Sequence, residues 1–151
     1  MKQFEKGRSM IEMLGVLAII GVLSVGGLSG YTMAMNRYRA NTILDYVTRA
    51  AVLAQTHGTG TEEQDDVCTM YNGNETAPSN FNGCRVETST STDVVRVTGT
   101  VGNEKVAEAL TSRSSQALCV SMKGTAATFL IGCSTECSKC TFSKSGQPQN
   151  P

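Results

Sequence analysis

A single carboxylate stands at the edge of a long apolar run near the N-terminus of this 151-residue chain. Residues 13–31 carry no charge, and Glu12 directly precedes them. A membrane-spanning helix needs about 20 mostly apolar residues, so this run is long enough to cross a bilayer. A carboxylate inside such a span costs on the order of a few kcal/mol at the bilayer centre and less near an end. We therefore expect a positive group to neutralise Glu12, and that group bears directly on function.

Six cysteines are the second set of chemically active side chains, and all of them follow the apolar run. An even number of cysteines in a small domain beyond a membrane segment predicts disulfides in an oxidising compartment. Six cysteines allow fifteen pairings, and the sequence does not choose among them. We expect one bridged loop and a separate C-terminal group of four. The candidates are Cys68 and Cys84 for the loop, and Cys119, Cys133, Cys137 and Cys140 for the C-terminal group.

Other chemistries for these residues are less well supported. The spacing from Cys133 through Cys137 to Cys140 is C-x3-C-x2-C, as in radical-SAM enzymes, but only eleven residues follow it. An iron–sulfur cluster or a zinc site would need reduced thiols, and no βαβ pattern surrounds Cys137 and Cys140 to indicate a redox motif. His57 is interpreted as part of a helix end, and the acidic residues 62–66 as a solvated loop, with calcium binding left open. We expect no enzyme activity, no cofactor and no metal site.

The composition favours one small extracytoplasmic domain. Thirteen basic and thirteen acidic residues cancel, so no global charge indicates a nucleic-acid partner. The chain has no Trp and 5% aromatic residues. About 90 residues remain after the hydrophobic segment and its extension, which is enough for one domain with a thin core.

A helical period continues from the apolar run to His57 without a proline. His57 and the following glycine form a helix stop. We therefore predict one helix over residues 9–57, which would be ~74 Å long at 1.5 Å per residue. Residues 8–30 are expected to form its membrane-spanning part and residues 31–57 its amphipathic extension. The stripe expected to face the globular domain contains Ile43, Tyr46, Val47, Ala50 and Ala54.

Beyond an acidic linker the period changes to that of strands, and the fold class predicted is α+β. A small antiparallel sheet would pack on the helix extension within a globular domain of residues 58–142. Residues 88–92 are interpreted as a loop, and residues 143–151 as a flexible tail. The expected elements are strands at 94–101, 118–122 and 127–131, and a short helix at 104–113 capped by Asn103.

Residues 7–12, Gly-Arg-Ser-Met-Ile-Glu, followed by an unbroken apolar helix, resemble the N-terminus of type IV prepilins and pseudopilins. The resemblance covers roughly the first 55 residues. It implies a leader of residues 1–7, cleavage by a prepilin peptidase after Gly7, and methylation of the new N-terminus at Arg8. Glu12 would be the fifth mature residue, paired with the terminal amine of a neighbouring subunit to set register. Lys2 and Lys6 fit a leader retained on the cytoplasmic side.

The chain departs from the family pattern at two places. Arg8 stands where an apolar residue is usual, and it is four residues before Glu12, so both can meet on one helix. We expect Arg8 to shield Glu12 before assembly. Many relatives have a proline lower in the helix, where this chain has Gly26, Gly27 and Gly30. These glycines either allow the helix to bend or permit close helix packing, as GxxxG motifs do.

The resemblance implies a structural subunit of a type IV pilus-like filament, built from copies of this chain or related pilins. Its other partners would be the peptidase, membrane lipid and an inner-membrane assembly platform. It would cross the bacterial inner membrane once, then enter an extracellular pilus. The alternatives are a pseudopilin of a type II secretion system, in a periplasmic filament, and a membrane-anchored disulfide-bonded domain that never polymerises. A cleaved secretory signal is a further alternative, although its apolar core is shorter, ~7–15 residues.

Overall fold

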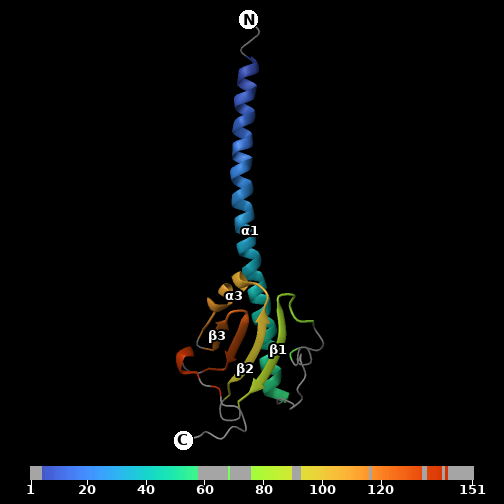
Figure 1. Cartoon of the computed structure of the whole chain (residues 1–151), viewed down its shortest axis with the longest axis vertical. Coiled ribbons are helices and arrows are strands. Elements are labelled where there is room, and N and C mark those ends of the chain that lie inside the picture. The colour runs from blue at the N-terminus through green and yellow to red at the C-terminus, as the bar shows by residue number, and fades with distance from the viewer. Residues whose placement is uncertain are drawn as a thin grey trace. The chain divides into compact units, whose positions relative to one another are not determined.

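The structure is a computed structural model of the whole chain, and it has an α+β layout (Figure 1). It describes residues 5–57, 68, 76–89, 93–115, 117–133, 136–140 and 142. In order, its elements are α1 (Glu5–His57), β1 (Phe81–Thr88), β2 (Val95–Val101), α3 (Glu104–Thr111), β3 (Leu118–Lys123), β4 (Ala126–Ile131) and the 3-10 turn η1 (Cys137–Lys139). The chain divides into two compact units, Met1–Met35 and Asn36–Pro151. The predicted leader, the acidic linker and the tail lie wholly or largely outside the described residues.

The first unit contains the apolar part of helix α1. Its described large apolar side chains, from Met10 to Met33, are 53–75% exposed. Within the described ranges, one helix is long and apolar enough to cross a membrane. The predicted long apolar helix is therefore confirmed, although it begins at Glu5 and not at residue 9. It continues through Gly26, Gly27 and Gly30 without a break in helical structure.

In the second unit, the C-terminal turns of α1 pack into the core of the domain. Tyr46 contacts Phe81 of β1 edge to face, with 6.4 Å between the ring centroids. Several alanines line the buried stripe, and their small side chains leave room for strand residues. The predicted stripe is confirmed, and α1 ends at His57 as expected. The buried residues of the stripe are Ala40, Ile43, Tyr46, Val47, Ala50, Ala51 and Ala54.

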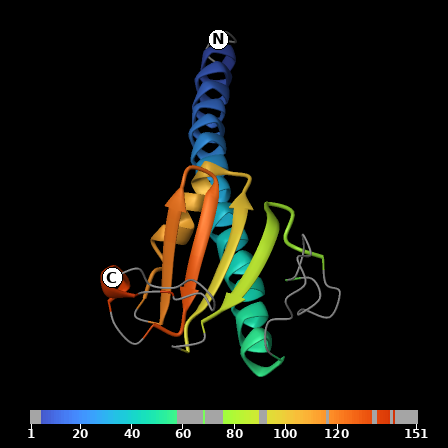
Figure 2. The same ribbon diagram turned by 60° about the horizontal axis from the view of Figure 1, so that its bottom comes forward.

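Four antiparallel strands form one sheet in the order β1-β2-β4-β3. Helix α3 connects β2 to β3, and β4 then returns between these two strands. Figure 2 shows this sheet lying across the C-terminal half of α1. The three predicted strands and the predicted short helix are confirmed. The cap is also confirmed, because the Lys105 amide donates to Asn103 Oδ1 at 2.9 Å.

The sheet buries one face, which we call the inner face. Val97 pairs with Phe129 of β4, which in turn pairs with Val120 of β3, so one apolar row crosses three strands. Val106 and Leu110 of α3 join the same core and are fully buried. The period-2 alternation of strands places their remaining side chains on the opposite, outer face.

Strand β1 was not expected from the sequence. Its register with β2 shifts between Asn82 and Arg85, and Gly83 lies at φ +63°, so its side chains do not alternate regularly. Thr88, expected in a loop, is the last residue of β1 and pairs with Val95. That expectation was wrong because the pairing partner, and not local composition, decides where this strand ends.

Candidate functional site

The N-terminal motif lies on the first turns of α1. Gly7 and Arg8 are helical, and Glu12 follows Arg8 by one helical turn, a separation at which side chains on a helix are neighbours. The side chain of Arg8 lies outside the described part of the chain, so the predicted shielding of Glu12 stays a prediction. Glu12 is exposed at the start of the apolar surface. Its neighbours along that surface are Met10, Ile11, Met13 and Leu14, which are also exposed.

All six cysteines are paired in disulfides. Cys68 is bonded to Cys84 across a sequence separation of 16 residues, which keeps the expected loop separate from the C-terminal group. Within that group the fold selects one of the three pairings that four cysteines allow. The bonded pairs are Cys119–Cys137 and Cys133–Cys140, with Cα atoms 5.3 and 5.9 Å apart.

The C-terminal disulfides lie on the outer face of the sheet. One row of side chains crosses all four strands there, because Arg96 pairs with Glu87 on one side and Leu130 on the other, and Leu130 pairs with Cys119. A small apolar cluster forms over this row. It contains Val94, Cys119 and Cys133 as buried members, with Leu130, Cys140 and Phe142 packed against them.

Arg96 links this cluster to the neighbouring strand. Its guanidinium lies 4.1 Å from the centroid of the Phe142 ring, a cation–π contact. The same guanidinium forms an ion pair with Glu87, and Arg96 Nε donates to Glu87 Oε2 at 2.6 Å. The Cys119–Cys137 bond and the Phe142 contact thus hold the segment after β4 to the outer face, and the Cys133–Cys140 bond closes a loop within that segment. Arg96 and Phe142 were not predicted from the sequence, although Arg96 lies between the apolar residues Val95 and Val97 and therefore points to the opposite face of the strand.

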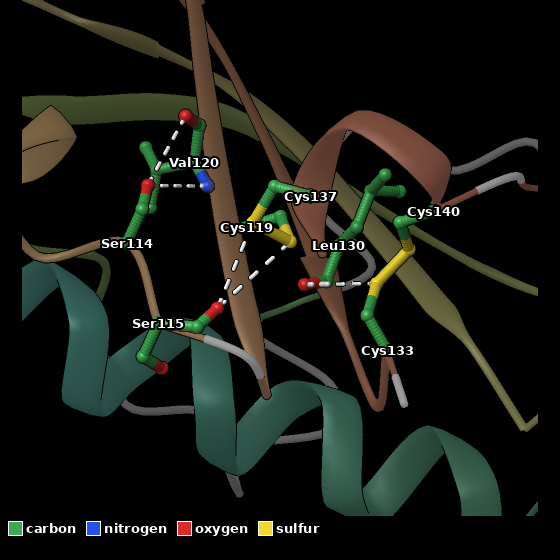
Figure 3. The surroundings of a disulfide bond; sticks show 8 residues. All are labelled: Ser114, Ser115, Cys119, Val120, Leu130, Cys133, Cys137 and Cys140. Atoms are coloured by element: carbon green, nitrogen blue, oxygen red, sulfur yellow. Dashed lines mark hydrogen bonds between the residues drawn. A yellow bond between two sulfur atoms is a disulfide. The ribbon is translucent and has the colours of Figure 1, made fainter. Parts of the chain in front are cut away.

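The sulfur atoms of the C-terminal group are close together. The Sγ atoms of Cys119, Cys133 and Cys140 all lie within 4.8 Å of one another. The Ser115 carbonyl oxygen lies 3.9 Å from Cys119 Sγ and 3.6 Å from Cys137 Sγ (Figure 3). Sulfurs in a disulfide carry neither a proton nor a charge, so the group could offer thiolate ligands only after reduction. In the paired state its available chemistry is thiol–disulfide exchange.

A shallow hollow lies between the end of α1 and the loop that joins β1 and β2. Gln55 Nε2 donates to the backbone oxygen of Asp93 at 2.9 Å and closes one side of it. Among the described residues that line it, Asp93 has the one ionisable side chain, so these residues supply no paired acid and base. It is lined by Ala54, Gln55, Thr88, Ser89, Asp93, Val94 and Val95.

The two candidate regions are therefore the exposed apolar helix with Glu12 and the outer-face disulfide group. Comparisons with protein-family models, with curated proteins and with solved structures find no match for this chain.

Proposed function

We propose that this chain is a type IV pilin-like subunit, cleaved after Gly7 and assembled through its apolar helix into a filament. Two features support the proposal together. The residues 7–12 resemble a prepilin cleavage motif, and the helix that follows leaves its apolar side chains uncovered. Lipid would cover this surface before assembly, and helices of other copies would cover it afterwards.

The single observation that carries the proposal is the exposure of this helix. Side chains such as Val22 and Val25 are each 75% exposed. Moving an apolar side chain of this size out of water stabilises a structure by about 1.5–3 kcal/mol. A continuous surface of fourteen such large residues, from Met10 to Met33, therefore favours burial in lipid or in a helix bundle.

Glu12 would then give the helix bundle its axial register. An isolated carboxylate is strongly disfavoured among packed apolar helices, so each copy needs a positive partner. Cleavage after Gly7 would create a terminal amine at Arg8, and a neighbouring subunit could offer it to Glu12. Such a pair specifies register more than it adds net stability, because desolvation of both charges offsets much of their attraction.

Mass spectrometry of the mature N-terminus tests the cleavage step. We expect the mature chain to begin at Arg8, with or without a methyl group. A start near residues 30–36 would instead support signal peptidase and a secreted domain, and an intact Met1 would support a simple membrane anchor. Either of these two results contradicts the proposal.

A pair of acidic variants tests the assembly step. Glu12→Gln removes the charge at the edge of the apolar surface, and Glu108→Gln removes an exposed charge on α3 as a matched control. We expect Glu12→Gln to reduce the yield of sheared or purified filaments at least about tenfold, the effect of about 1.4 kcal/mol. The control should assemble normally. Normal filament yield from Glu12→Gln contradicts the assigned role of this carboxylate.

The location of the filaments separates the pilus from the pseudopilus. Chain recovered in filaments sheared from the cell surface supports a pilus subunit. Retention in the periplasm, with a loss of protein secretion on deletion, supports a pseudopilin. Finding the chain only as monomers in the membrane supports the non-polymerising anchored domain.

A further inference from the structure

The four C-terminal cysteines place two disulfides next to each other. Cys119 comes from β3, Cys133 follows β4, Cys137 is the first residue of the single turn η1, and Cys140 directly follows that turn. The Sγ atoms of Cys119, Cys133 and Cys140 lie within 4.8 Å of one another although they belong to two different bonds. Figure 3 shows the two bonds side by side over the outer face. Once released from its bond, Cys119 Sγ would therefore lie close to both sulfurs of the Cys133–Cys140 bond.

The six cysteines differ in their exposure to solvent. Cys119 and Cys133 are each 5% exposed, whereas Cys140 is half-buried and Cys137 is exposed. Cys68 and Cys84, which form the third disulfide, are 0% and 1% exposed. An external thiol can therefore approach the C-terminal group at Cys137 but finds no comparable entry at the Cys68–Cys84 bond. Access is one of the quantities that sets the rate of thiol–disulfide exchange.

We propose that these four cysteines form a thiol–disulfide exchange site, which a small thiol or a dithiol protein enters at Cys137. The site interconverts the observed pairing and a second pairing, Cys119–Cys133 with Cys137–Cys140. This inference does not depend on the proposed function, since it concerns the globular unit alone.

The exchange balances without net oxidation or reduction. An external thiolate attacks Cys137 Sγ, forms a mixed disulfide and releases Cys119 as a thiolate. Cys119 attacks Cys133 Sγ and releases Cys140, and Cys140 then attacks Cys137 and regenerates the external thiolate. Two disulfides are present before and after, and no proton is consumed. Uncatalysed rearrangement of this kind takes minutes to hours, and we expect that timescale here.

The second pairing fits the surroundings of each sulfur. Cys119 and Cys133 already lie in the same buried cluster with Val94, so a bond between them would be shielded from solvent. Two residues, Ser138 and Lys139, separate Cys137 from Cys140, which is the C-x2-C spacing of redox-active dithiols. The exchanged form would thus present a more accessible C-x2-C disulfide to a dithiol partner.

Mapping of disulfide-linked peptides tests the proposal on the full chain in detergent. Trypsin cleaves after Arg113, Lys123 and Lys139, and a glutamate-specific protease cleaves after Glu136. Each of the four cysteines then lies on a separate peptide. With a small amount of reduced glutathione, we expect peptides that join Cys119 to Cys133 to rise at least about tenfold over a thiol-free sample. If the observed pairing stays unchanged at equilibrium, the proposal is wrong.

A variant removes the need for the external thiol. Cys137→Ser leaves Cys119 as a free thiol beside the Cys133–Cys140 bond, and we expect linkage of Cys119 to Cys133 without glutathione. If iodoacetamide labels Cys119 completely and Cys133 stays bonded to Cys140, the proposal is overturned.

The third disulfide gives the matched control. Cys84→Ser frees Cys68, which lies in the core away from the outer-face group. We expect Cys68 to stay unlinked to the four C-terminal cysteines. Cross-linking of Cys68 to that group, in this variant or in the wild-type chain with glutathione, would show that exchange follows general unfolding, and it would overturn a site at Cys137.

Discussion

The two faces of the sheet are stabilised in different ways. On the inner face, fully buried side chains such as Val97 and Phe129 pack against helices α1 and α3. On the outer face, the Cys119–Cys137 disulfide and the Arg96–Phe142 contact hold a short segment to the sheet, and the Cys133–Cys140 disulfide closes a loop within it. A domain of this size has too little apolar surface for two full cores. The comparison shows covalent bonds replacing burial on the face that neither α1 nor α3 covers.

The largest effect should come from truncation of the inner face. Phe129→Ala removes a fully buried ring that contacts Phe81 at a centroid distance of 6.0 Å. We expect the free energy of unfolding to fall by about 3–5 kcal/mol, because the truncation loses apolar burial and leaves a cavity. Urea unfolding followed by near-UV circular dichroism measures it. Leu130→Ala, at the adjacent residue on the outer face, is the control and should lower the free energy of unfolding clearly less. Equal losses from the two variants would contradict the difference between the faces.

The next largest effect concerns the Cys119–Cys137 bond on the outer face. Replacing both cysteines by serine releases a loop with a sequence separation of 18 residues. The chain-entropy relation gives a loss of about 3 kcal/mol in the free energy of unfolding. The same change at Cys133 and Cys140, with a separation of 7 residues, should cost about 2 kcal/mol. If neither double variant lowers the urea midpoint, the outer face does not depend on its disulfides.

Overpacking of the inner face should have an intermediate effect. A Cβ atom added at Gly99 would lie 2.3 Å from Cζ of Phe81, so Gly99→Ala forces the ring to move. We expect a loss of about 1–3 kcal/mol in the free energy of unfolding. At Gly102 the nearest atom to an added Cβ is 4.0 Å away, and Gly102→Ala is the matched control. A similar loss in the free energy of unfolding at both positions would argue against tight packing of the Phe81 ring against β2.

The smallest effect should come from the aromatic contact on the outer face. Phe142→Leu keeps an apolar side chain but removes the ring over Arg96. We expect a loss of about 0.5–1 kcal/mol, typical of a cation–π contact near the surface. A double-mutant cycle with Arg96→Met isolates the pairwise contribution. A coupling energy of zero between Phe142 and Arg96 would show that the cation–π contact does not stabilise the segment after β4.

Much of the fold was predictable because its signals are local. Val95, Val97 and Val101 alternate along their strand, and Val106 and Leu110 recur at helical spacing beside a capping Asn103. The stripe from Ile43 to Ala54 likewise predicts which side of α1 is buried. Strand β1 has no such signal, since Gly83 and the register shift interrupt its alternation. Its existence depends on pairing with β2, which is a contact between separate segments.

The two candidate regions also differ in how far the sequence alone predicts them. Glu12 and the apolar run could be found from the sequence, because a charge beside a membrane-length segment is conspicuous by itself. The partners of Cys119 and of Arg96 could not be found, since they depend on which strands become neighbours. In the sheet, β4 lies between β2 and β3 and brings Leu130 beside both Arg96 and Cys119.

The sequence by itself thus determined the long apolar helix, the separation of that helix from a cysteine-rich domain, and the apolar faces of three strands. Each of these follows from periodicity or composition within one short stretch of chain, where neighbouring residues dictate the outcome. Only the tertiary structure decided the strand order, the choice among disulfide pairings and the proximity of the sulfurs of Cys119, Cys133 and Cys140. These are contacts between distant segments, and many of them are compatible with the same local patterns until the chain packs into one core.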